Sequence, residues 1–329
     1  MILSKTPLRM SFVGGGSDLP AYYRDTPGAV LSTAIDKYIY LAVNRKFDGR
    51  IRLSYSRTEE VDHFMEVQHP LVREALAITG VQTGIEIASL ADIPSSGSGL
   101  GSSSSFTVGL LNALNAYQGR HVSKDQLAEQ ACEIEINRCG EPIGKQDQYA
   151  AAFGGLNLIQ FYPDETVTVD PVRCSLSTIR KFEENILVFF TGRTRSASQV
   201  LVKQSEDLRA GSHRRLMQRM VELAFELKKE LEAGVLDAIG ALLHENWRLK
   251  AQLADGISDL EIDNWYETGI KNGATGGKLL GAGNGGFIMF YAAPETHIAI
   301  TRALAKLEPI KFGFDRAGAQ ITYYQPESR

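Results

Sequence analysis

The stretch that decides the fold is PSSGSGLGSSSS, from Pro94 to Ser105, and an amphipathic helical pattern follows it at once. Glycines permit positive φ angles and a close approach of the main chain to a charged ligand. The first N–H groups of the following helix are unpaired, and together with the helix dipole they favour an anion. A flexible linker is the alternative, but Pro94 and the helical pattern favour a rigid loop. The stretch therefore predicts a site for the phosphates of a nucleotide.

Two common loop motifs are excluded here. The stretch lacks the lysine that a Walker A loop needs after its last glycine. It also has no serine at the centre of G-x-S-x-G, which a hydrolase nucleophile requires. A serine hydrolase remains a distant alternative, because the sequence places no histidine near these serines.

Composition indicates a soluble globular enzyme without nucleic-acid or membrane partners. The chain has 329 residues, of which 43% are hydrophobic and 22% charged, and this length favours two domains. A net charge of −4 argues against nucleic acid, and no apolar run is long enough to span a bilayer. Cys132, Cys139 and Cys174 form no metal-ligand spacing, and no secretory signal pattern precedes Pro7, so a reducing cytoplasm is expected. The sequence does not indicate an oligomeric state.

The periodicity predicts an α+β chain with a boundary near residue 174, giving domains 1–174 and 175–329. Helical spacing runs through Phe106–Tyr117, and Ser123 with Gln126 forms a capping box for a second helix. The second half combines long charged helices within Ser196–Leu253 with strands and one later helix. Strands are predicted at Ala29–Val43, Ile51–Tyr55, Gly84–Ser89, Leu156–Tyr162, Ile186–Thr191 and Phe287–Ala292, and the later helix at Glu295–Leu307.

Two carboxylates stand out by their positions. Glu135 follows Leu127 and Ala131 at helical spacing, so it is expected on the apolar face of its own helix. A buried carboxylate needs a cation, and with a loop serine it would suit Mg²⁺; a salt bridge to an arginine is the alternative. Asp147 is expected at the start of a short helix, where an N-cap is its simplest role.

Three sequence motifs, in this order along the chain, resemble the motifs of a known protein family. They are PLRMSFVGGGSDLPAYY (Pro7–Tyr23), PSSGSGLGSSS, and KLLGAGNGGFIMF (Lys278–Phe290). Together they resemble the three signatures of the GHMP kinases. The glycines of the third motif also satisfy G-x-G-x-x-G, but a strand follows them, so the dinucleotide fingerprint fails on context. A purely structural hairpin is the alternative for this third motif.

The resemblance implies a two-domain α+β kinase that uses ATP and Mg²⁺. The N-terminal domain would be ribosomal protein S5 domain 2-like and the C-terminal domain ferredoxin-like. Asp147 matches the catalytic aspartate, and Glu135, twelve residues earlier, matches the metal-binding glutamate, with Ser103 as the hydroxyl ligand. Arg9 matches the basic residue of the first motif, whereas Lys145 is chosen for its proximity to Asp147 in the sequence. The phosphate-binding residues would be Pro94, Gly97, Ser98, Gly99, Leu100, Gly101, Ser102, Ser103 and Ser104.

The substrate implied is a sugar, and more narrowly a sugar phosphate. Asp18 matches the aspartate that binds sugar hydroxyls, and Gly15, Gly16 and Ser17 before it are expected in the same substrate site. These three replace the residues that precede the aspartate in galactokinases. This GGGSD form is similar to that of heptose 7-phosphate kinases and, more distantly, of L-fucokinases. The third motif would add Gly283, Asn284 and Gly285 to the substrate site.

A second pointer to a phosphorylated sugar is GRTRSAS, which follows a predicted strand and opens a predicted helix. Arg193 and Arg195 would bind a distant phosphate there, unless they join the two domains or face water. The expected reaction transfers the γ-phosphoryl group of ATP to the anomeric hydroxyl. Another sugar 1-kinase, such as an L-fucokinase-like enzyme, and a non-catalytic sugar and ATP sensor are the alternatives.

Overall fold

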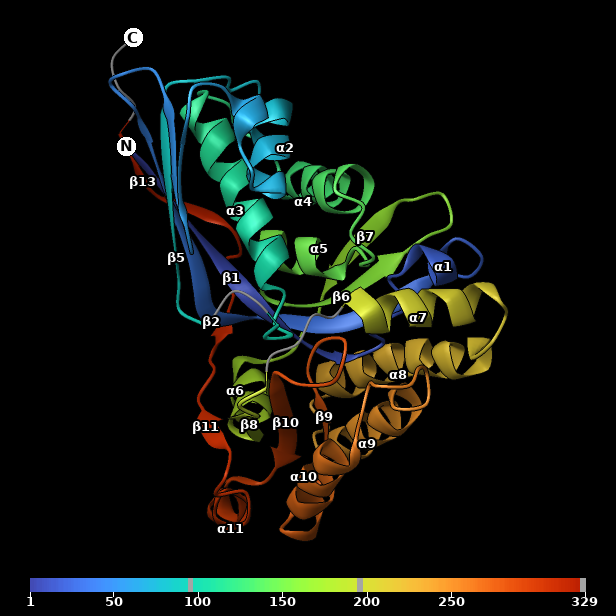
Figure 1. The fold of residues 1–329 in the computed structure, drawn as a ribbon. Helices are drawn as coiled ribbons and strands as arrows, with labels where there is room; N and C mark the ends of the chain where they lie inside the picture. The colour runs from blue at the N-terminus through green and yellow to red at the C-terminus, as the bar shows by residue number, and fades with distance from the viewer. Residues whose placement is uncertain (94–96, 194–197, 326–329) are drawn as a thin grey trace.

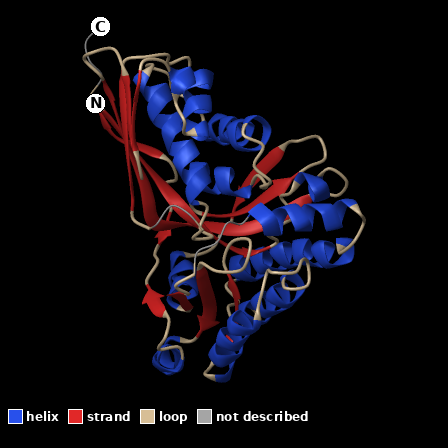
Figure 2. Ribbon diagram, viewed as in Figure 1, coloured by secondary structure: helices blue, strands red, loops and turns tan. Residues whose placement is uncertain are grey.

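Two β-sheets and the helices around them form an α+β molecule, as the computed structural model shows for residues 1–93, 97–193 and 198–325 (Figures 1 and 2). Pro94 and Arg195, expected to bind phosphate, lie outside these described residues. In the described part of the chain, every helix is too short or too polar to cross a lipid bilayer.

The larger sheet has the strand order β13-β1-β2-β5-β3-β4, and β2 also pairs with β6 and β12. The long strand β2 is buried along most of its length, because it lies centrally and packs on both faces. Its pairing with β1, β5 and β6 is antiparallel, whereas β3 and β5 are parallel. The bounds are β1 Ile2–Val13, β2 Gly28–Arg45, β3 Ile51–Ser54, β4 Thr58–Val61, β5 Ile85–Ala91, β6 Leu156–Phe161, β7 Val167–Pro171, β12 Phe314–Asp315 and β13 Gln320–Tyr324.

Four helices cover one face of this sheet, while a long helix, α8, packs on the other (Figure 1). The four are α2 Pro70–Thr79, α3 Ser102–Tyr117, α4 Lys124–Cys132 and α5 Gln146–Phe153, and α8 spans Arg214–Ala233. The predicted capping box of α4 is confirmed: Ser123 Oγ accepts from Gln126 N, and Gln126 Oε1 accepts from Ser123 N. A π-helical turn, Glu133–Arg138, continues α4.

The smaller sheet has the order β11-β8-β10-β9, and α9 and α10 pack on β9. Its strands are β8 Ile186–Phe190, β9 Ala274–Leu279, β10 Phe287–Ala292 and β11 Glu308–Ile310. The helices of this half are α6 Leu176–Glu184, α7 Ser198–Arg209, α9 Ile239–Lys250, α10 Leu260–Lys271 and α11 His297–Ala303; the short α1, Pro20–Tyr23, contacts α7.

The end of the chain returns to the first sheet. Strand β13 pairs with β1 and β12 with β2, and the amino group of Met1 donates to Gln325 O at 2.6 Å. Figure 1 accordingly shows β13 at the same end of the molecule as the beginning of β1. A boundary at residue 174 separates β1–β7 from the second sheet. Strands β12 and β13 lie after that boundary but pair with strands of the first sheet, about 280 residues or more earlier in the chain. The division at 174 stays a prediction.

Candidate active site

The serine-glycine loop and the C-terminal glycine loop lie against each other at one end of the larger sheet. A Cβ on Gly281 would lie 2.5 Å from Gly99 Cα, and a Cβ on Gly99 would lie 2.7 Å from Leu280 O. Gly99 and Gly281 both have a φ of +75°, which also favours glycine. The two motifs, almost two hundred residues apart, therefore need glycine where they touch.

Helix α3 begins inside the loop, and its first residues line the cavity. The N–H of Ser105 donates to Gly101 O at 2.9 Å, which is the first bond of the helical ladder. The N–H groups of residues 102–104 precede that ladder, so they are available to an anion. Ser102, Ser103 and Ser104 line the cavity together with Gly97, Ser98, Gly99 and Gly101.

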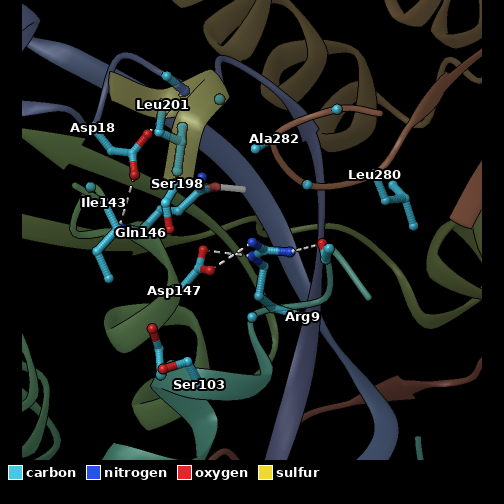
Figure 3. A pocket seen from close by; sticks show the side chains of 18 of the residues that line it. Arg9, Asp18, Ser103, Ile143, Gln146, Asp147, Ser198, Leu201, Leu280 and Ala282 are labelled. Carbon is cyan, nitrogen blue, oxygen red and sulfur yellow. Dashed lines mark hydrogen bonds and ion pairs between the residues drawn. The ribbon is translucent and has the colours of Figure 1, made fainter. Parts of the chain in front are cut away.

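Arg9 and Asp147 meet at the centre of the cavity, as Figure 3 shows. Arg9 Nε donates to Asp147 Oδ1 and Arg9 Nη2 donates to Asp147 Oδ2, both at 2.7 Å. Arg9 Nη1 donates to Gly99 O at 2.6 Å, so the arginine joins the aspartate to the glycine loop. Asp147 lies in the first turn of α5 and is not its N-cap, which is Lys145. This bidentate pair fixes the carboxylate while each oxygen keeps a lone pair for a ligand.

Asp18 lies at the other end of the cavity and is held by main-chain donors. Its Oδ1 accepts from Gly16 N at 2.9 Å and its Oδ2 accepts from Gln146 N at 3.3 Å. A Cβ on Gly144 would lie 2.0 Å from Asp18 Oδ2, so only glycine fits beside this carboxylate. Burial raises the pKa of Asp18, and the negative charge of Asp147 acts in the same direction.

Glu135 is fully buried behind Ser103 and does not itself line the cavity. Its Oε1 accepts from Ser103 Oγ at 2.8 Å and from Thr107 Oγ1 at 3.2 Å, and its Oε2 accepts from Gln148 Nε2 at 2.6 Å. Burial raises the pKa of Glu135 to about 7 and outweighs the hydrogen bonds it receives. In the described part of the chain no arginine pairs with it, so the salt bridge considered from the sequence is not formed.

The cavity has a volume of about 240 Å³ and brings motifs from both halves of the chain together. Besides the loop residues, Arg9, Gly15, Gly16, Asp18, Asp147, Gly283 and Gly285 line it, all of them expected from the sequence. Gln146, Gln204 and Lys250 line it as well and were not expected.

Comparisons with known proteins agree with this arrangement. The GHMP kinases N terminal domain matches residues 65–155, and the GHMP kinases C terminal domain matches residues 227–308. A D-glycero-alpha-D-manno-heptose 7-phosphate kinase from Campylobacter jejuni is 30% identical over 97% of this chain and 98% of its own. The chain belongs to the GHMP kinase family.

Other relatives place it among the sugar kinases of that family. A bifunctional fucokinase/GDP-fucose pyrophosphorylase from Arabidopsis thaliana is 29% identical over 87% of this chain and 29% of its own. The crystal structure of a D-glycero-D-manno-heptose 1-phosphate kinase from Bacteroides thetaiotaomicron superposes with a TM-score of 0.81 at 26% identity, over 98% of this chain and 99% of that one. The expected two-domain GHMP kinase fold and phosphotransferase class are thus confirmed.

Some expected residues lie elsewhere in the kinase. Lys145 donates to Glu165 and lies over the ring of Tyr23, in a different cavity, because side chains two positions apart at a helix start point to different sides. Leu100, Ser17 and Asn284 do not line the active cavity. They form hydrogen bonds next to the cavity instead. Leu100 O accepts from Arg9 N, Ser17 Oγ donates to Ala29 O, and Asn284 Oδ1 accepts from Arg193 Nη2.

Arg193 is occupied by carboxylates rather than free for a substrate phosphate. Its Nη2 donates to Asp259 Oδ2 at 2.6 Å and its Nη1 to Glu261 Oε2 at 3.3 Å. Its carbonyl accepts from Gly286 N at 2.7 Å, so this residue anchors the third motif. These partners all lie within 175–329, so the contacts of Arg193 stay inside the predicted C-terminal domain and do not join the two domains.

Lys250 is the cation of the cavity that sequence reasoning missed. It ends α9, lines the cavity, and donates to Gly281 O. No motif surrounds it, and the only sequence signal is a lysine in the last turn of a helix, which is common at helix ends.

Proposed function

We propose that this kinase transfers the γ-phosphoryl group of ATP to the anomeric hydroxyl of D-glycero-D-manno-heptose 7-phosphate, giving the 1,7-bisphosphate. The observation that carries the proposal is the Arg9–Asp147 pair, which lies between the amide-lined loop at α3 and the Asp18 carboxylate. The heptose 7-phosphate kinase of Campylobacter jejuni supports this substrate because it aligns along nearly the whole chain.

Asp147 would accept or orient the proton of the anomeric hydroxyl. The sugar oxygen forms a bond to the γ-phosphorus, the bond from that phosphorus to the β–γ bridging oxygen breaks, and ADP leaves with the electron pair. Such transfers pass through a loose transition state in which positioning and charge neutralisation matter most. Arg9 supplies a fixed positive charge at this point, since its side chain is only 5% exposed.

Glu135 and Ser103 would hold Mg²⁺. A fully buried carboxylate surrounded by Ser103, Thr107 and Gln148, with no cation paired to it among the described residues, fits a metal that prefers oxygen ligands. When bound, Mg²⁺ neutralises charge on the β- and γ-phosphates. Before binding, Glu135 orients the Ser103 hydroxyl at the start of α3.

The adenine base would occupy a second cavity of about 510 Å³ that shares Ser102 and Ser103 with the first. Aromatic side chains form one wall: the ring centroids of Tyr55 and His69 are 4.9 Å apart, and those of His69 and Phe106 are 5.3 Å apart. His69 Nδ1 is buried without a hydrogen-bond partner. An orphaned ring nitrogen among aromatic and aliphatic groups suits a heteroaromatic base with hydrogen-bonding edges.

A sugar panel tests the proposal. ADP release is measured with heptose 7-phosphate, the unphosphorylated heptose, L-fucose and galactose, with Mg-ATP. The proposal expects heptose 7-phosphate to give the highest kcat/KM. Equal or faster reaction of L-fucose would favour a fucokinase, and no ADP release with any sugar would favour a sensor.

A further inference from the structure

A hollow beside Gly15 is surrounded by donor groups from three elements. The position of a Cβ on Gly15 lies 3.9 Å from each of Lys250 Nζ, Gln146 Nε2 and Ser11 Oγ. These groups come from α9, α5 and β1 respectively. Because residue 15 has no side chain, nothing of its own fills the space between them. Converging nitrogen and hydroxyl donors suit a ligand group with several acceptor oxygens.

Lys250 brings a buried positive charge that forms no ion pair within the described part of the protein. The residue is only 5% exposed, and its Nζ donates to a neutral carbonyl, Gly281 O. Among the described residues no carboxylate forms an ion pair with it. Three acids line the cavity: Asp147 is paired with Arg9, Asp18 accepts from main-chain N–H groups, and Glu141 forms no ion pair with Lys250 among the described residues. A buried cation without a counter-charge is costly unless a ligand supplies one.

Two further buried donors next to this region lack acceptors. Lys278 is fully buried and its Nζ has no hydrogen-bond partner. Asn246 precedes Lys250 by four residues on α9, so both lie on the same helix face. Its Oδ1 accepts from Gly14 N at 3.1 Å, which fixes the amide orientation and leaves the buried Nδ2 without a partner. Gln146 Oε1 is a buried acceptor that also lacks a partner, so two unpartnered donors, Lys278 Nζ and Asn246 Nδ2, stand against one unpartnered acceptor among the described residues of this region.

We propose that Lys250, with Gln146 and Ser11, binds a phosphoryl group in the hollow beside Gly15. The proposal rests on the kinase function proposed above and adds a phosphate subsite that replaces the Arg193 site expected from the sequence. Two phosphoryl groups have the required chemistry: the transferable γ-phosphoryl group of ATP and the phosphate carried by the sugar. Both are dianionic acceptors for a lysine.

The charges around Lys250 agree with an anionic ligand. Burial lowers the pKa of Lys250 to about 8, and the positive charge of Arg9 acts in the same direction, while Asp18 and Asp147 oppose it. Burial also lowers the pKa of Lys278, next to Lys250 and Arg9. A bound phosphoryl group would favour the charged form of Lys250, so its binding would take up protons near pH 8.

Kinetics of Lys250→Met and Lys250→Arg test the subsite and identify its occupant. Lys271→Met, in the exposed last turn of α10, is the matched control. If the sugar phosphate occupies the hollow, Lys250→Met raises KM for heptose 7-phosphate at least tenfold and leaves the unphosphorylated heptose unaffected. If the γ-phosphoryl group occupies it, Lys250→Met lowers kcat at least tenfold with both sugars. Lys250→Arg restores part of either loss. If kcat and KM of Lys250→Met stay within twofold of wild type with both sugars, the proposal is overturned.

Calorimetry separates this proposal from the proposed function. Heptose 7-phosphate, the unphosphorylated heptose, ADP and a non-hydrolysable ATP analogue are titrated into wild type and Lys250→Met. A selective loss of affinity for heptose 7-phosphate or for the ATP analogue supports the subsite even if the wild type transfers no phosphate to any sugar. Unchanged affinities for both overturn it even if the enzyme is active. Lys250→Gln, compared by melting temperature, replaces Lys250→Met if that variant does not fold.

Discussion

Replacing Glu135 by glutamine should stabilise the metal-free protein at alkaline pH and abolish its response to Mg²⁺. The carboxylate is fully buried, and desolvation raises its pKa from 4.5 to about 7. The neighbours tolerate an amide, because Gln148 can turn its orphaned Oε1 toward it in place of the Nε2 that now donates. The turned amide places Gln148 Nε2 where its unpartnered Oε1 now lies, so the substitution removes a buried charge and exchanges one unpartnered acceptor for one unpartnered donor.

The size of the effect follows from the pKa. A carboxyl whose pKa is higher in the folded state favours folding when protonated, so its contribution is complete below pH 4.5 and is lost as the pH rises through 7. At about 1.4 kcal/mol per pKa unit, the shift from 4.5 to about 7 corresponds to about 3 kcal/mol. Part of this is already lost at pH 5. Between pH 5 and pH 8, Glu135→Gln should gain about 2–3 kcal/mol relative to wild type.

Urea denaturation in EDTA at pH 5 and pH 8 measures this gain, with Glu129→Gln as the control because Glu129 is exposed on α4. Glu129→Gln should have the same free energy of unfolding as wild type at both pH values. Addition of Mg²⁺ at pH 8 should raise the free energy of unfolding of the wild type and leave Glu135→Gln unchanged. A difference between Glu135→Gln and wild type that does not change with pH would refute the reasoning, as would an equal response of both proteins to Mg²⁺.

The remaining predictions concern the cavity itself. Asp147→Asn should lower kcat about 10²–10⁴-fold, as loss of a positioned base does. Calorimetry should find the affinity of the variant for Mg-ATP within twofold of wild type. A kcat near that of wild type would reduce the residue to a structural role. The pKa of Lys250 is about 8, so its charged form is lost above that pH. The affinity for phosphorylated ligands, measured by calorimetry from pH 7 to 9.5, should therefore fall. An affinity that does not change with pH would count against the charge assignment. Gly281→Ala should destabilise the fold by about 1–3 kcal/mol and weaken ATP binding, since its Cβ would meet Gly99. Gly256→Ala, which shares a positive φ but has open space around it, should keep ATP affinity, and equal ATP affinities of the two alanine variants would contradict the loop contact.

The parts of the site that sequence predicts are those that motifs and local spacing encode. Asp147 and Glu135 are twelve residues apart, and both matched their motif positions. The start of α3 follows from glycines and serines in one short stretch. Burial of Glu135 follows from its spacing to Leu127 and Ala131, although a π-helical turn carries it there. These features depend on residues that are close together in the sequence, so the periodicity of the sequence can predict them.

The parts that sequence does not predict depend on distant partners. Arg193 pairs with Asp259 and Glu261, more than sixty residues later, and its local pattern of a basic residue at a helix start contains no signal for these partners. Lys250 gains its position only because α9 packs on β9, which brings it to Gly281. The return of β13 to β1 likewise depends on the whole chain. No window of sequence contains both members of any of these contacts.

The position of the new phosphate on the product tests the central claim most directly. ³¹P nuclear magnetic resonance follows wild type with Mg-ATP and heptose 7-phosphate, and then with Asp147→Asn. The account predicts a second sugar phosphate signal coupled to the anomeric proton, formed in step with ADP and nearly absent with the variant. Inorganic phosphate as the only new product, or a phosphate coupled to another sugar proton, would contradict it.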